Sequence, residues 1–451
     1  MLQNERDHAD ARGSATAVDA ESAPGDVILS VQEVSENETF VQPAETSVKS
    51  SAEVKKEIAT PPTSQTKVLF LDGVRGLAAL LVVTQHSHEY MQSVNLGAVA
   101  VDAFFVLSSF LLTWLFTKKS MKLLAQGASY RKWAFTLADY FSKRFFRVYP
   151  LFALLAVVLW LLPFEDKQRY YLVKESGDFD LYKVLTFDFD HRFFVLWTLP
   201  LEISYYFCIP VFVVAVLRMR RFWWIPFLPL YAWVVHEGWF TFRTSHAPLL
   251  QHFPTFLAGS TAAVIFVKLD TWIKTTGFQF RAWHTALIRL VEGTVIAVLL
   301  SVCFRGLFFD WVHENPAPST PGFPFISVLL TMVFVIEMIR PSCVSTMFEW
   351  SVLRYWGKIS FSVYLLHSFV VYAPVISVQP NYFNRAFSRF FLIMVLATLS
   401  YYFVEYPSQL LAQKISRALA AQEAKGPGGS VKFTCMERIV ASRSSMHKAA
   451  M

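Results

Sequence analysis

The stretch FLDGVRGLAALLVVTQHSHEY, residues 70–90, decides what kind of protein this chain is. Its apolar run approaches the length that a helix needs to cross the hydrocarbon core of a bilayer. The same stretch contains Asp72, Arg75 and His86. Charged or titratable side chains inside a membrane helix are costly and tend to mark functional positions. The stretch therefore predicts a transmembrane helix that contributes to a site.

Arg75 and His86 share one face of this predicted helix. They are eleven residues apart, and at about 100° per residue this separation returns to within roughly 20° of the same direction. At a rise of about 1.5 Å per residue, the two positions lie about 16 Å apart along the axis. One stripe thus carries a cation near one end and an imidazole near the other. Taken singly, each side chain also fits an interfacial residue, with the Arg75 side chain reaching toward lipid headgroups.

The rest of the chain repeats this apolar character. Of its 451 residues, 54% are hydrophobic and 17% are charged, whereas a soluble domain carries roughly 25% charged residues. This composition excludes a soluble enzyme, a nucleic-acid-binding module and a disordered scaffold. It predicts an all-α, polytopic membrane bundle of about ten transmembrane helices. The predicted spans are 68–87, 98–116, 148–164, 193–217, 222–240, 249–267, 285–308, 323–339, 359–378 and 386–405.

Polar tails flank the predicted bundle, 67–408. Residues 1–66 hold 12 acidic and 5 basic side chains, which predicts a disordered acidic tail. Residues 409–451 are predicted to form a basic tail. Lys and Arg concentrate in loops on one side, such as 117–147, so the positive-inside rule places both termini in the cytosol. A plasma membrane and an endomembrane fit this orientation equally well. The four cysteines show no paired spacing, so neither a disulfide framework nor a metal site is predicted.

Two acidic residues fall in other spans. Asp102 begins the second span on the same membrane side as His86, where a carboxylate can hold the imidazole tautomer and raise its basicity. Glu202 lies in the fourth span, two residues after Pro200. Because proline removes a helix hydrogen bond, this pair predicts a kink beside a lined cavity.

Basic and aromatic residues complete the candidate set. Arg144 and Arg147 are three residues apart at the cytosolic boundary of the third span, where they can clamp phosphates or simply anchor the helix. His367 lies near the middle of the ninth span with Tyr364 one turn before it. A role in substrate binding and a role in interhelical hydrogen bonding fit this pair equally well.

Six segments, in this order along the chain, resemble the membrane-bound acyltransferase family 3. They are the first span with its Arg and His, VDAFFVLSSFLL, KRFFRVYP, LWTLPLEISYY, GKISFSVYLLH and VEYP. The resemblance covers roughly residues 68–408 and implies a stand-alone member of the fungal type, a kind that includes O-acetyltransferases of small biosynthetic products. One departure is Ser109, where the family usually has glycine. The larger side chain puts the predicted shape of the acyl pocket in question.

The resemblance implies transfer of an acyl group, usually acetyl, from cytosolic acyl-CoA to a hydroxyl of a small metabolite, lipid or glycan. It implies the bilayer as a partner, with no nucleic acid and no metal. The family's essential residues and motifs map onto Arg75, His86, Asp102, Glu202, Arg144 and Arg147. His86, oriented by Asp102, is then the expected general base or a transiently acylated group. Glu202, His367 and Tyr364 are expected to position the acceptor or stabilise developing charge.

Two other functions use the same buried polar residues. A carrier or flippase for an amphiphilic metabolite needs them without any chemistry. A membrane cyclase would use Asp102 and Glu202 as proton donors. The basic motif at Arg144 and Arg147 favours the acyltransferase, because a cyclase has no need of a phosphate clamp.

Overall fold

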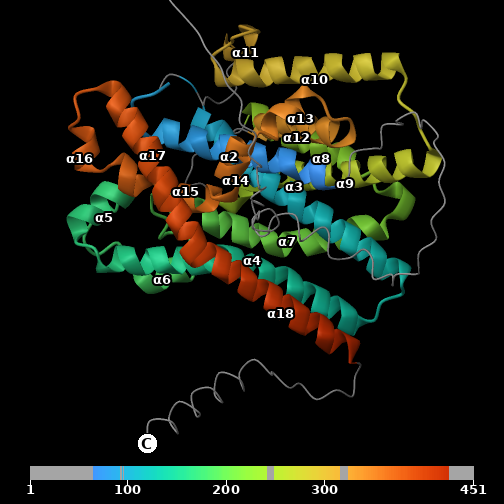
Figure 1. Ribbon diagram of the computed structural model, residues 1–451. Coiled ribbons are helices and arrows are strands. Elements are labelled where there is room, and N and C mark those ends of the chain that lie inside the picture. Colours follow the sequence, from blue (N-terminus) through green and yellow to red (C-terminus); the bar gives the residue numbers. More distant parts are fainter. Residues whose placement is uncertain (1–63, 92–93, 95, 241–247, 315–323, 426–451) are drawn as a thin grey trace, which may run out of the picture. The chain divides into compact units, whose positions relative to one another are not determined.

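The computed structural model describes residues 64–91, 94, 96–240, 248–314 and 324–425. Within these ranges every regular element is a helix (Figure 1), which confirms the predicted all-α fold. Seven helices of this part of the chain are long and apolar enough to cross a membrane. Most of the predicted acidic tail and the end of the predicted basic tail lie outside the described residues.

All ten predicted spans overlap helices. The seven long segments are α2 (Ser64–His86), α3 (Leu96–Ala125), α4 (Tyr130–Leu161), α7 (Thr198–Arg218), α9 (Leu249–Thr276), α10 (Ala282–Cys303) and α17 (Tyr382–Ser400) continued by α18 (Tyr406–Ala424). Three shorter helices account for the other spans: α8 (Phe227–Phe240), α12 (Pro324–Ile339) and α15 (Ser360–Val371). Short helices connect them: α5 (Phe164–Tyr171), α6 (Leu181–Leu185), α11 (Trp311–Glu314), α13 (Cys343–Phe348), α14 (Ser351–Lys358) and α16 (Pro374–Ser377).

Helix α3 is the most buried of the long helices and packs against α7, α9 and α12. Its closest approach to α9 explains the departure at Ser109. A Cβ atom on Gly259 would overlap the Ser109 hydroxyl, which donates to the carbonyl oxygen of Phe105 at 2.9 Å. The extra side chain at 109 is therefore accommodated by a glycine on the facing helix, and its hydroxyl is satisfied within its own helix.

Helix α2 makes an even closer crossing with the short helices α13 and α14. A Cβ on Gly73 would overlap the backbone carbonyl of Phe348, and one on Gly76 would overlap that of Leu353. In the other direction, a Cβ on Gly357 would overlap the carbonyl of Asp72. Such backbone-to-backbone contact is possible only where side chains are absent, and small residues commonly serve this purpose in membrane helices. The crossing holds the part of α2 that carries Arg75 against α13 and α14.

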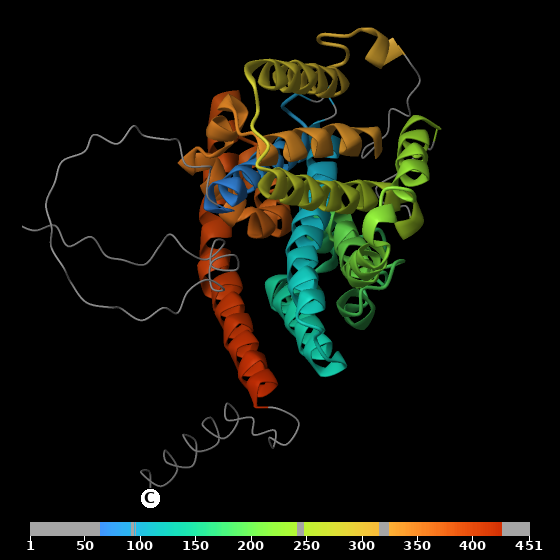
Figure 2. The same cartoon turned by 90° about the vertical axis from the view of Figure 1, so that its right-hand side faces the viewer.

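Two helices extend well beyond the predicted spans. Helix α4 begins at Tyr130, 18 residues before the predicted start at 148. The last span does not end near Pro407 but passes through a π-helical turn, Tyr401–Glu405, into α18. Pro407 stands in the first turn of α18, where its missing N–H costs little. The first part of the predicted basic tail is thus helical, and α18 packs along α4 (Figures 1 and 2).

Candidate functional site

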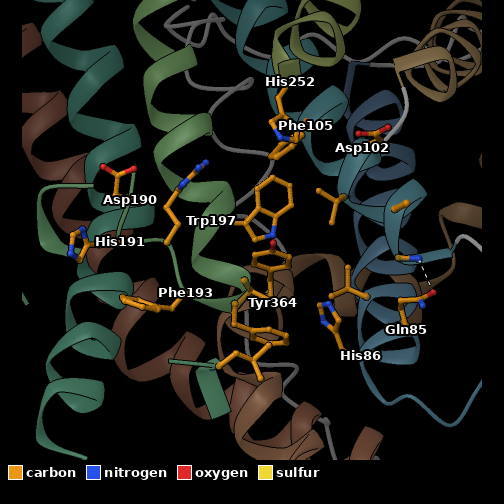
Figure 3. Close-up of a pocket in the computed structure, with 18 of the residues that line it drawn as sticks. Gln85, His86, Asp102, Phe105, Asp190, His191, Phe193, Trp197, His252 and Tyr364 are labelled. Carbon is orange, nitrogen blue, oxygen red and sulfur yellow. Dashed lines mark hydrogen bonds between the residues drawn. The ribbon is translucent and has the colours of Figure 1, made fainter. Parts of the chain in front are cut away.

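A cavity of about 720 Å³ lies at the C-terminal end of α2, hereafter the His86 end. Its walls come from α2, α3, α9, α15 and the segment 172–197 (Figure 3). The inner wall is largely aromatic, and the segment 172–197 contributes charged groups. The aromatic residues are Phe105, Phe193, Phe194, Trp197 and Tyr364, and the charged or titratable residues of the segment are Lys174, Asp178, Asp190, His191 and Arg192. A cavity of this size suits a small molecule or part of a larger one.

Two imidazoles from distant parts of the sequence meet at this cavity. Nδ1 of His86 lies 2.8 Å from Nε2 of His367. The ring planes differ by 3°, with 5.0 Å between the centroids. At this separation the parallel rings are joined edge to edge by a hydrogen bond rather than packed face to face. His86 lines the cavity, and His367 lies behind it with no exposed surface.

The environment of His367 defines the direction of its hydrogen bonds. Nδ1 of His367 faces the backbone carbonyl oxygens of Tyr364 at 2.9 Å and Val363 at 3.1 Å. A carbonyl oxygen can only accept, so Nδ1 of His367 carries a proton and donates. The sequence left two roles open for His367, substrate binding and interhelical hydrogen bonding. The structure shows that this residue joins α15 to α2 through its contact with His86.

Asp102 does not hold His86 in the way that its position in the sequence suggested. It is fully buried and lines the same cavity, but it stands apart from His86 (Figure 3). The hydrogen-bond partner of His86 within the described residues is His367. A carboxylate close in sequence was the natural candidate, because the pairing with a helix 281 residues away cannot be deduced from local spacing.

Phe194 is a site residue that sequence reasoning missed. Its ring packs on both imidazoles, with centroids 4.8 Å from His86 and 5.7 Å from His367. Its backbone has a φ of 42°, in the left-handed region that bulky residues rarely adopt. Strained conformations of this kind persist where the surroundings impose them, and they concentrate at functional sites. Phe194 thereby covers the imidazole pair, and no sequence signal announces its conformation.

His252 also lines the cavity and was not singled out. It comes from α9 and is 1% exposed, with its ring close to those of Trp197 and Phe105. A histidine inside the sixth predicted span was visible in the sequence, and titratable residues in membrane helices are functional candidates by default. The sequence therefore gave a reason to consider His252, but it gave no indication of the cavity that this side chain lines.

Glu202 belongs to a second polar group, around Arg75 near the middle of α2, hereafter the Arg75 end of the site. Its Oε1 accepts hydrogen bonds from Ser108 at 2.5 Å and from the Tyr206 hydroxyl at 2.7 Å. The predicted kink at Pro200 is wrong, because this proline stands in the first turn of α7, where its missing N–H disrupts no hydrogen bond. Glu202 is thus held by hydrogen bonds from two helices rather than by a break in its own.

Arginines gather around Glu202. Arg75 pairs with Asp72 at 3.5 Å and lies within electrostatic range of Arg147 and Glu202. The guanidinium of Arg144 lies over the ring of Tyr140, 5.6 Å from its centroid. The structure thereby brings the predicted phosphate clamp and Arg75 to the same end of the bundle.

Glu405 joins this group from the π-helical turn. It is 3% exposed, accepts a hydrogen bond from Ser362, and lies within electrostatic range of Arg75 and Arg147. The last predicted span, 386–405, ends at this residue. Its burial follows from the continuation of the helix past Pro407, which the local pattern argued against.

Two positions along one helix, its C-terminal end and its middle, therefore hold two different groups. Among the predicted residues, the His86 end has His86, Asp102 and Tyr364 on the cavity, with His367 behind. The Arg75 end has Arg75, Glu202, Arg144 and Arg147. Tyr364 lies within electrostatic range of Glu202, so the two groups are neighbours across the bundle.

The sequence matches a known protein family. A family model described as "Acyltransferase domain" matches residues 68–406. The chain therefore belongs to this acyltransferase family, as its motifs predicted. It is a multi-pass membrane protein. No solved structure matches the chain.

Curated relatives with similar sequences are named as O-acetyltransferases. The protein named "Putative peptidoglycan O-acetyltransferase YrhL" of Bacillus subtilis is 25% identical over 365 residues, covering 75% of this chain and 54% of the relative. The peptidoglycan O-acetyltransferase OatA of Listeria monocytogenes is 24% identical over 362 residues, covering 75% of this chain and 55% of the relative. The chain thus spans about half the length of the curated relatives it matches.

Proposed function

We propose that this chain is a membrane O-acyltransferase that moves an acyl group, typically acetyl, from cytosolic acyl-CoA to a hydroxyl of a small metabolite, lipid or glycan. The observation that carries the proposal is the His86–His367 pair at the wall of the 720 Å³ cavity. Histidine is the side chain that most often serves as general base in enzymes. The family supplies acyl transfer as the reaction class.

His86 is the proposed general base of the transfer. Its imidazole takes the proton of the acceptor hydroxyl while the acceptor oxygen attacks the thioester carbonyl carbon. The carbon–sulfur bond then breaks, and the leaving thiolate takes the proton from His86, so that ester and free CoA result. In a two-step variant, His86 attacks the thioester first and passes the acyl group to the acceptor. Both routes need the same ring nitrogen to be unprotonated.

The Arg75 end is the proposed docking site of the donor. The phosphates of CoA require cations, and Arg75, Arg144 and Arg147 offer planar donors suited to phosphate oxygens. Arg75 and His86 are separated by about 16 Å along α2, a span comparable with the pantetheine arm that joins the nucleotide to the thioester. With the N-terminus in the cytosol, this end faces the acyl-CoA pool, and the His86 end faces the opposite side.

The cavity at the His86 end is the proposed acceptor site. Its aromatic residues suit the apolar face of an acceptor, and the charged groups of 172–197 suit the hydroxyls or charges of that acceptor. Asp102 and Tyr364 are proposed to contact the acceptor there. Two of the relatives are named for peptidoglycan, and a cavity of this size fits either a small hydroxylated metabolite or one part of a larger glycan.

The test uses the full chain in lipid nanodiscs with radiolabelled acetyl-CoA and a panel of alcohols. Wild type should consume thioester and label an alcohol, and His86→Ala should lose at least about 100-fold in rate, the usual contribution of a general base. His88→Asn is the matched control, because asparagine tolerates the positive φ of 53° at His88. Turnover that survives in His86→Ala would overturn the proposed role. Absence of thioester consumption with any acyl-CoA would favour a carrier.

A further inference from the structure

We infer that His367 is a positioning residue that keeps Nε2 of His86 free of a proton. The inference rests on the proposed role of His86 and assigns the group that makes its imidazole competent. It differs from the expectation that Asp102 orients His86 and that His367 contacts substrate.

The argument starts at the buried end of the pair. Nδ1 of His367 donates to the carbonyl oxygens of Tyr364 and Val363, at 2.9 and 3.1 Å. A neutral imidazole carries one N–H, so Nε2 of His367 is an acceptor. That acceptor faces Nδ1 of His86 at 2.8 Å, and Nδ1 of His86 must donate to it. The single proton of a neutral His86 is thereby placed on Nδ1, and Nε2 is left with a free lone pair.

The arrangement also stabilises the product of proton transfer. When Nε2 of His86 takes the hydroxyl proton, the ring becomes a cation that still donates from Nδ1 to His367. Charge-assisted hydrogen bonds are roughly twice as strong as neutral ones. The carbonyl groups behind His367 align their dipoles with this charge, so the chain of hydrogen bonds strengthens as the proton moves. A carboxylate plays the corresponding part where an acid orients a catalytic histidine.

The surroundings keep this geometry rigid. His367 has no exposed surface, and Phe194 covers both rings. Tyr171 is buried and donates its hydroxyl proton to the carbonyl oxygen of Leu365 at 2.5 Å, which fixes α15 beside His367. The ring of His367 is therefore held in place and shielded from water, and its hydrogen bond to His86 restrains the ring that faces the cavity.

The test compares two substitutions that differ in one property. In His367→Gln the side-chain oxygen can still accept from Nδ1 of His86, whereas His367→Leu removes the acceptor and keeps a similar bulk. The leucine variant should lose about 100-fold or more in kcat with little change in either KM, since a wrong tautomer disables a base without altering binding. The glutamine variant should recover at least about tenfold of that loss.

Nitrogen-15 NMR of the histidine-labelled full chain in lipid gives a readout that needs no turnover. His86 signals are identified by their loss in His86→Ala. Wild type and His367→Gln should show His86 with a protonated Nδ1 and a bare Nε2, and His367→Leu should shift it toward a protonated Nε2. A protonated Nε2 on neutral His86 in wild type would overturn the inference, as would equal kcat in the leucine and glutamine variants. Failure of the acyltransferase proposal would instead appear as absent turnover in wild type with the tautomer as inferred.

Discussion

The His86 end and the Arg75 end of the site, at the C-terminus and the middle of α2, use polar side chains in opposite ways. At the His86 end, two imidazoles joined at 2.8 Å are enclosed by aromatic rings and backed by backbone carbonyls. At the Arg75 end, several arginines and the carboxylates of Asp72, Glu202 and Glu405 surround one another. One end is built to hold a proton in a defined place, and the other to hold charge. A single helix thus carries residues of two chemically different groups, and its rise per residue sets the distance between them.

The two ends also differ in how the backbone is held. The Arg75 end depends on close backbone contact through Gly73, Gly76 and Gly357. The His86 end depends on side chains, because the loop after His86 is clamped by Glu89, whose carboxylate is 3.1 Å from Arg385 Nε and 2.9 Å from Arg389. Substitutions should therefore act through packing at one end and through hydrogen bonds at the other.

The largest effect is expected from Gly73→Ala. The new methyl group would overlap the backbone carbonyl of Phe348, and backbone cannot move aside as a flexible side chain does. Overpacking of this kind costs about 1–3 kcal/mol, so the melting temperature in detergent should fall by several degrees and much of the protein should be lost as aggregate on size-exclusion chromatography. Gly177→Ala is the control, since nothing surrounds a Cβ at that position. Equal melting temperatures for the two variants would contradict the close crossing.

A smaller effect, on binding alone, is expected from Arg147→Ala. Loss of one charge-assisted contact to phosphate should raise the KM for acyl-CoA about 10-fold or more while kcat changes little. Arg218→Ala removes an exposed arginine at the end of α7 and should leave this KM unchanged. The pattern is the reverse of that expected for His367→Leu, in which kcat falls. If Arg147→Ala lowered kcat with KM unaltered, the division of tasks between the two ends would be wrong.

The smallest effect is expected from Glu89→Gln and depends on pH. Partial burial alone raises the pKa of the Glu89 carboxyl, but hydrogen bonds and charge from Arg385 and Arg389 outweigh it and hold the pKa below its usual value of 4.5. A lowered pKa in the folded state means that the clamp contributes fully above pH 4.5 and is lost as the pH falls through the folded-state pKa.

Glu89→Gln should therefore melt about 2–4 °C below wild type at pH 7, as loss of about 1 kcal/mol produces. The difference should narrow as the pH is lowered below 4.5. This difference in melting temperature is measured by thermal scans of both proteins at a series of pH values. A difference that stays constant down to pH 3 would show that the charge of Glu89 is not what holds the loop.

Much of the fold followed from residue patterns. The apolar spans were found at the right places because hydrophobic length is a local property, and the family motifs identified the reaction class. Boundaries failed where the chain leaves the apolar region without ending its helix, as at Tyr130 and Pro407. Charge and proline predict a stop there, but packing of α18 on α4 continues both helices.

The candidate residues were predicted better than their partners. Arg75 and His86 do share one helix with the expected separation, because helical periodicity depends on nothing beyond the helix. The pairing of His86 with His367 and the conformation of Phe194 arise from segments that are far apart in the sequence. Burial of Glu405 depends on the same kind of long-range contact.

The sequence by itself determined that this chain is a helical membrane protein of an acyltransferase family, with an arginine and a histidine on one helix. Those properties depend on composition, helical periodicity and short motifs, and each of these can be recognised within a single segment of the sequence. The tertiary structure alone decided which group orients the histidine, where the cavity lies and which acids accompany the arginines. Hydrogen bonds act over about 3 Å, so these pairings depend on which helices lie side by side, and no spacing along the chain contains that information.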